Sequence, residues 1–74
     1  PAMKTIYVRP ARATGGKAGK GYNKTSTVQV LVEESGPGGK SLRLDRAFRF
    51  MVGDVLSYNM AKAKAEAHAK TLEQ

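Results

Sequence analysis

The fold is decided by residues 25–34, which read TSTVQVLVEE. Val28, Val30 and Val32 share one side of this stretch when the chain is extended, and the alternate positions are mostly polar. β-Branched residues on one side and polar residues on the other favour a strand of an antiparallel sheet with one face in water. The sequence therefore predicts that this strand supplies its valine side to the core.

A turn and a returning strand follow this stretch. Residues 35–39 read SGPGG, in which the glycines supply positive φ angles and Pro37 fixes its own φ. The returning residues 40–52 place their core candidates at even positions: Leu42, Leu44, Phe48, Phe50 and Val52. Arg46 interrupts this series, and burying its charge without a partner is costly. We therefore expect a bulge or a turn near Asp45 and Arg46, giving one bent strand or two short ones.

Two further elements flank the hairpin. Residues 5–9 alternate with Ile6 and Val8 on one side, and Pro10 ends that strand or confines it to an edge. After the returning strand, Asp54 can cap a helix over residues 55–73, which are rich in Ala, Lys and Glu. The predicted fold class is α+β: a small antiparallel sheet of three to four strands, packed on one C-terminal helix, with a flexible basic loop between the first two strands.

The predicted helix carries two apolar stripes on nearly opposite sides. One contains Leu56, Met60, Ala63 and Ala67, and the other contains Tyr58, Ala61, Ala65 and Leu72. One stripe is expected to pack on the sheet. The second, narrow stripe suits a helix from another copy, so a homodimer through the C-terminal helix is one interpretation, which Ala65→Glu would disturb. The other interpretation is that the alanines serve helix propensity alone.

Length and composition limit the class of protein. Seventy-four residues allow a single small domain over 1–74, with Pro1 and Ala2 before Met3 interpreted as a tag remnant. The absence of cysteine excludes disulfides and thiolate metal sites. The sequence has no signal-peptide pattern and no apolar run long enough to span a membrane, so a cytoplasmic location is expected.

The positive charge is concentrated near the start of the chain. Six of the 13 Lys and Arg residues and none of the six acids precede Glu33, so +6 of the net charge of +7 lies there. Most of it falls in residues 10–24, a glycine-rich segment that we expect to form a mobile loop. Lysines and arginines that neutralise phosphates release counterions and so bind nucleic acid without sequence preference. The alternative is a solvated loop that aids solubility.

The strand faces opposite the valines add to this basic segment. Tyr7, Arg9, Gln29, Arg43 and Arg49 are expected to form an exposed face that continues the loop. The predicted nucleic-acid contacts are Arg9, Arg12, Lys17, Lys20, Tyr22, Lys24, Arg43 and Arg49, with Tyr22 or Tyr7 stacking on a base. The sequence thus predicts a small nucleic-acid-binding protein, with DNA favoured over RNA. The alternative is a protein-binding module, such as a phage or mobile-element inhibitor, that turns its basic surface to an acidic partner.

No enzymatic chemistry is predicted. Residues 15–21 read GGKAGKG, but Thr14 and Gly21 stand where a phosphate-binding loop needs Gly and Ser or Thr, and a strand follows instead of a helix. His68 is the sole histidine, which leaves no catalytic triad and too few ligands for a metal. We therefore expect no cofactor, metal, small-molecule substrate or membrane partner.

The last part of the chain resembles two nucleic-acid-binding patterns. Strands followed by a helix containing residues 63–67, AKAEA, are similar to the three-strand-plus-helix arm-binding domains of phage-type integrases. The same helix resembles the C-terminal helix of double-stranded RNA-binding domains. This chain lacks the N-terminal helix of double-stranded RNA-binding domains. The integrase arm-binding domains lack a long basic insertion after their first strand. Neither resemblance therefore assigns residues.

Overall fold

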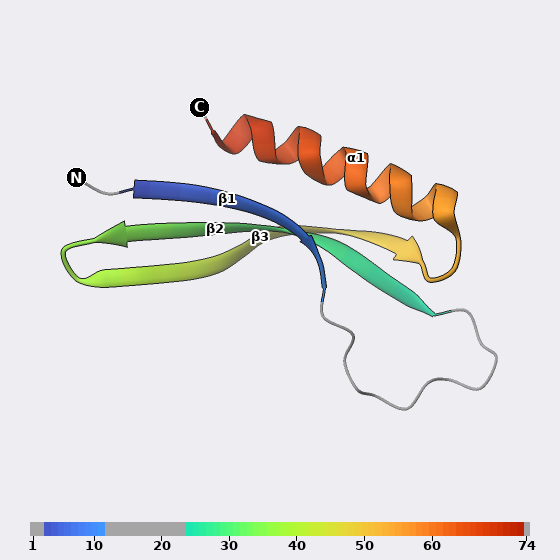
Figure 1. Cartoon of the computed structure of the whole chain (residues 1–74), viewed down its shortest axis with the longest axis horizontal. Helices are drawn as coiled ribbons and strands as arrows, with labels where there is room; N and C mark the ends of the chain where they lie inside the picture. The colour runs from blue at the N-terminus through green and yellow to red at the C-terminus, as the bar shows by residue number, and fades with distance from the viewer. Residues whose placement is uncertain (1–2, 12–23, 74) are drawn as a thin grey trace.

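The computed structural model describes residues 3–11 and 24–73. They form β1 (Met3–Pro10), β2 (Thr25–Gly36), β3 (Gly39–Met51) and α1 (Val55–Leu72). The strands make one antiparallel sheet in the order β1-β2-β3, and α1 lies across one face of it (Figure 1). The predicted α+β class is confirmed, with three strands. Most of the predicted basic loop, residues 12–23, lies outside the described residues.

The core lies between α1 and the valine side of β2. Val28, Val30 and Val32 are wholly buried, and Ala61, Ala65 and Ala69 are the buried residues of the helix. Around them pack partly buried side chains from β1, β3 and α1: Ile6, Val8, Phe48, Phe50, Tyr58 and Leu72. Because the three alanines are spaced by four residues, they lie along one side of the helix. Their small side chains let the helix approach the sheet closely. The predicted valine core is confirmed.

The helix begins as the sequence predicts. Oδ1 of Asp54 accepts a hydrogen bond of 3.0 Å from the backbone N–H of Ser57, which satisfies one of the free donors of the first turn. Of the two predicted stripes, the one with Ala61 and Ala65 faces the sheet. The idea that Ala65 could report a dimer contact is therefore wrong, because its side chain is fully buried within one chain. In the described residues, no helix is long and apolar enough to cross a membrane.

The hairpin of β2 and β3 contains the predicted irregularity. A two-residue turn closes it at Pro37 and Gly38, and Gly39 after the turn has a φ of 114°. Val30 pairs with Arg46, but the next residue of β2, Leu31, pairs with Leu44. Asp45 is thus the extra residue of a β-bulge within a single strand of 13 residues. Of the two expected alternatives, one bent strand and two short ones, the structure shows a single strand with a bulge.

The bulge reverses which side chains of β3 face the helix. Before it, Leu42 and Leu44 pair with Glu33 and Leu31, so they lie on the sheet face away from α1 and are exposed. Their predicted place in the core is wrong, because one extra residue shifts the two-residue period of the strand. The same prediction fails for Val52, which lies in the turn after β3 and is exposed.

Arg46 stays on the helix side without being buried. It is exposed, and its guanidinium carbon lies 5.0 Å from the centre of the Phe48 ring. A cation over an aromatic face is attracted to the negative side of the ring. Arg46, which interrupts the hydrophobic series, therefore keeps its charge in solvent while its side chain covers part of the Phe48 ring.

Candidate nucleic-acid interface

The sheet face opposite α1, called the open face below, is set by the strand register. Arg9 of β1 pairs with Gln29 of β2, which pairs with Ala47 of β3. On the neighbouring row, Thr27 pairs with Arg49. These residues alternate with the buried valines, so they project from the side that the helix does not cover. The sequence-based placement of Arg9, Gln29 and Arg49 on this face agrees with the register.

Arg9 and Arg49 stand close together at one end of the open face. Two strand spacings and one step of two residues put their Cα atoms roughly 12 Å apart. Both side chains are exposed, and Gln29 and the small Ala47 lie between them. We call Arg9, Gln29 and Arg49 the basic end. Its two charges lie where a phosphate backbone that crosses the strands could contact both.

Residues 12–23 leave and re-enter the sheet at this same end. The backbone N–H of Ala11 donates to the carbonyl of Thr27 at 2.8 Å, and that of Val52 donates to the carbonyl of Lys24 at 2.9 Å. These bonds extend both strand pairings up to the last described residues on either side of the segment. Lys24 is exposed, whereas the predicted contacts Arg12, Lys17, Lys20 and Tyr22 lie outside the described residues. The sequence places three bases and no acid in residues 12–23, between two points fixed beside the basic end.

Tyr7 lies on the open face one row away from Arg9. Its hydroxyl donates a hydrogen bond of 3.0 Å to Oε1 of Glu33. This bond, and then the negative charge of the carboxylate, raise the pKa of the Tyr7 phenol above its ordinary value of 10.0. The side chain is still 39% exposed, so Tyr7 can contact a ligand while Glu33 holds its hydroxyl.

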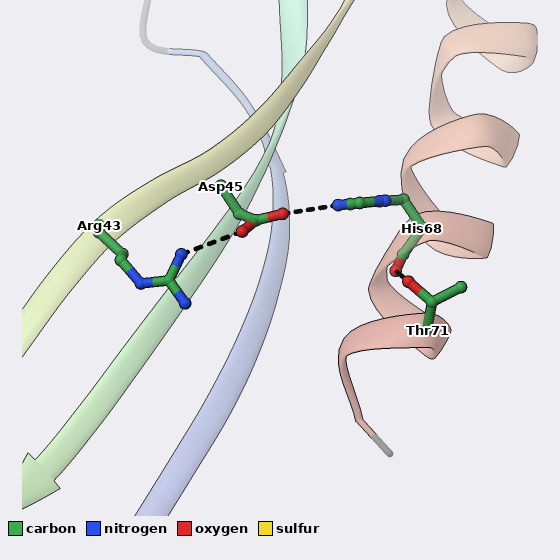
Figure 2. A network of polar contacts seen from close by, with 4 residues as sticks. All are labelled: Arg43, Asp45, His68 and Thr71. Carbon is green, nitrogen blue, oxygen red and sulfur yellow. Dashed lines mark hydrogen bonds and ion pairs between the residues drawn. The ribbon is translucent and has the colours of Figure 1, made fainter.

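Arg43 is not on the open face. It pairs with Val32, so it lies on the helix side of the sheet, and its Nη1 donates to Oδ1 of Asp45 at 3.0 Å. Figure 2 shows that Asp45 in turn reaches His68 of α1, with 2.6 Å between Oδ2 and Nε2. The prediction that Arg43 shares a face with Arg49 is wrong, because the bulge at Asp45 separates them. The sequence offers no sign of this network, since 23 residues separate Asp45 from His68.

Two exposed leucines, Leu42 and Leu44, occupy the part of the open face where Arg43 was expected. Leu42 and Leu44 flank the buried Leu31, one and two rows beyond Gln29 and Ala47. Their alternation with Arg43 is visible in the sequence, but the position of the bulge decides which set faces water. The open face therefore combines a basic end with an apolar middle.

Metal ligation has no candidate group in residues 3–11 and 24–73. No cluster of three or more His, Cys, Asp or Glu side chains there could hold a metal ion. His68 is half-buried, bonded to Asp45 and edge-on to Phe48 with 6.1 Å between ring centres. Comparison of the chain with family models, with curated proteins and with solved structures finds no match.

Proposed function

We propose that this protein binds nucleic acid without catalysing a reaction, largely by electrostatic attraction to the phosphate backbone. The observation that carries the proposal is the coincidence of two basic features. The segment between Ala11 and Lys24, which includes Arg12, Lys17 and Lys20, is attached at the end of the sheet where Arg9 and Arg49 are exposed. The bases of this segment are thus attached beside two exposed arginines, and both sets could contact one phosphate backbone.

In this proposal phosphate contacts give most of the affinity and little sequence preference. Arg9 and Arg49 contact phosphates from the sheet, and the lysines and Arg12 of the attached segment add contacts beside them. Tyr7 or Tyr22 stacks on a base or sugar. DNA is favoured over RNA as the partner.

A salt titration tests the proposal. With five phosphate contacts, the logarithm of the binding constant for duplex DNA should fall with the logarithm of salt concentration at a slope of roughly −4 to −5. Fluorescence anisotropy with labelled duplex and single-stranded DNA and RNA, at several salt concentrations, measures the slope and the preference among them. A slope near zero for all four ligands would contradict the proposal.

Paired variants test the contribution of the sheet. Arg9→Ala with Arg49→Ala should weaken binding and reduce the magnitude of the slope by about 2. Lys62→Ala with Lys70→Ala removes the same charge from exposed positions on α1 and should change the slope far less. Lys17→Ala, Lys20→Ala and Lys24→Ala together should weaken binding uniformly across sequences. Equal effects of the sheet and helix pairs would show that only net charge matters.

The apolar middle of the open face, formed by Leu31, Leu42 and Leu44, favours a second candidate function. Exposed Leu42 and Leu44 beside a basic end suit a protein partner with an acidic rim around an apolar centre. A module of this kind could act as an inhibitor from a phage or mobile element. Leu42→Thr with Leu44→Thr should then abolish capture of a single acidic protein and leave nucleic-acid binding unchanged. Purification at low salt separates the two functions, because co-purifying nucleic acid supports the first.

A further inference from the structure

The side of α1 that faces away from the sheet carries an apolar patch. Leu56 is 70% exposed and Met60 is 54% exposed, and they lie one turn apart on the helix surface. Val52, in the turn before the helix, and Val55, its first residue, are exposed as well. Leu56 and Met60 thus form an exposed apolar pair near the start of the helix, and exposed apolar surface of this kind is a candidate site of interaction.

A groove adjoins this patch. It runs between β3 and α1, has a volume of about 290 Å³, and is lined by Phe48 and Arg49 on one side and by helix residues on the other. Leu56 and Met60 form its outer rim, since they lie about 100° around the helix from Ser57 and Ala61, which also line it. The protruding side chains and the hollow beside them therefore belong to one surface.

We propose that this surface, Leu56, Met60 and the adjoining groove, is the contact of a homodimer. A two-fold axis presents the same patch from both chains, so each copy must offer both a projection and a recess. The patch has both: Leu56 and Met60 of one chain can enter the groove of the other. A partner of unrelated shape would not need the two features side by side.

The charges around the groove fit the same arrangement. Asp54 lies at the start of α1 and Lys64 lies ten residues later, roughly 15 Å along the helix, and both line the groove. If two copies pack their helices antiparallel, Asp54 of each chain lies near Lys64 of the other. Two Asp54–Lys64 pairs across the axis would favour a second copy, while Arg49, which also lines the groove, adds one positive charge from each chain.

Burial within one chain also favours a second copy. The largest wholly buried side chains are valines, and the helix contributes three alanines to the core. Domains of this size bury only about 60% of the surface of the unfolded chain, and self-association is one ordinary source of further burial. The patch is small for an interface, so we expect a weak dimer with a Kd of about 10 µM to 1 mM.

This dimer leaves Arg9 and Gln29 of the basic end free, whereas Arg49 also lines the groove and would lie at the edge of the contact. The patch lies on and beside the outer side of α1, and Arg9 and Gln29 lie on the opposite side of the sheet from the helix. Two copies would then carry two basic ends on separate surfaces of one particle. The dimer does not depend on nucleic-acid binding, and it can be tested without any ligand.

Sedimentation equilibrium over a range of protein concentrations tests the proposal. The wild-type chain should associate to a dimer, and Leu56→Glu or Met60→Glu should raise the Kd at least tenfold. Leu44→Glu is the matched control, because Leu44 is 53% exposed on the open face and the substitution adds the same charge. Circular dichroism confirms that each variant is folded. A monomer at every concentration overturns the proposal, and so does a dimer lost with Leu44→Glu but kept with Met60→Glu.

Cross-linking gives an independent readout, because the chain has no cysteine. Met60→Cys should form a covalent dimer under mild oxidation much faster than Leu44→Cys. Equal rates would indicate random collision and contradict the proposed contact. Vesicles of phosphatidylglycerol test the alternative that the apolar side of α1 binds a lipid surface. A wild-type chain that stays monomeric but sediments with these vesicles, through Leu56 and Met60, would replace the dimer by a lipid surface.

Discussion

Nε2 of His68 lies 2.6 Å from Oδ2 of Asp45, which joins the second half of α1 to the bulge of β3 (Figure 2). In the described part of the chain, no other hydrogen bond between two side chains connects the helix to the sheet. The valines and alanines of the core are small and have few directional contacts. We therefore expect this bond to fix where along the sheet the helix sits.

The first prediction concerns this bond. Asp45→Ala and His68→Ala should each lower the urea midpoint, and the double variant should be little worse than the more damaging single one, since both remove the same contact. Arg43→Ala is the control, because the Arg43 side chain is 57% exposed and its bond to Asp45 is worth less. Fully additive effects of Asp45→Ala and His68→Ala would show that the two residues act separately.

The second prediction is a dependence of stability on acid. Hydrogen bonds from His68, and then from Arg43, lower the pKa of the Asp45 carboxyl below its ordinary value of 3.8. A carboxyl with a lowered pKa in the folded state stabilises the protein above its unfolded pKa, and this contribution is lost as the pH falls through the folded pKa. The difference in urea midpoint between wild type and Asp45→Asn should therefore shrink between about pH 5 and pH 2. A difference that stays constant over this range would contradict the assignment.

The third prediction separates the two sides of α1. Ala65→Glu should unfold the protein, because the side chain is fully buried and a charge there has no partner. Ala63→Glu makes the same change two residues earlier at an exposed position and should shift stability by less than about 0.5 kcal/mol. Thermal melts by circular dichroism measure both. A folded Ala65→Glu variant would mean that the helix packs through another side.

The fourth prediction tests the bulge. Leu44→Thr should change the free energy of unfolding by no more than about 0.5 kcal/mol, because Leu44 faces water on the open face. Phe48→Ala should lower that free energy by about 2–3 kcal/mol, less than the roughly 3–5 kcal/mol of a fully buried Phe, since Phe48 is half-buried. If Leu44→Thr cost as much as Phe48→Ala, the strand would run without the extra residue at Asp45.

Most of the fold follows from local patterns in the sequence. The alternation around Val28 and Val30 predicts the central strand, and Asp54 predicts the start of the helix. What could not be predicted is the sheet face on which the side chains of residues 40–44 lie. Alternation assigns even-numbered residues to one sheet face on one side of a bulge and to the other face on the other side. The sequence around Asp45 and Arg46 indicates an irregularity, but it does not show that a single extra residue reverses the faces.

The candidate site was predicted only in part, for the same reason. Arg9 and Arg49 lie on strand segments that pair with β2 on the loop side of the bulge, so their facing follows from simple alternation. Arg43 lies beyond the bulge and was assigned to the wrong face. The bond of His68 to Asp45 depends on where α1 crosses the sheet, which no local pattern determines.

The strand order β1-β2-β3 has a kinetic consequence. Each strand pairs with its neighbour in the sequence, and the two-residue turn at Pro37 and Gly38 closes β2 on β3 with a very short loop. Such a hairpin forms in about 1–10 µs, whereas β1 must close the longer segment before Lys24. We therefore expect folding to start at this turn and extend toward the bulge, with β1 and α1 docking on a hairpin already formed.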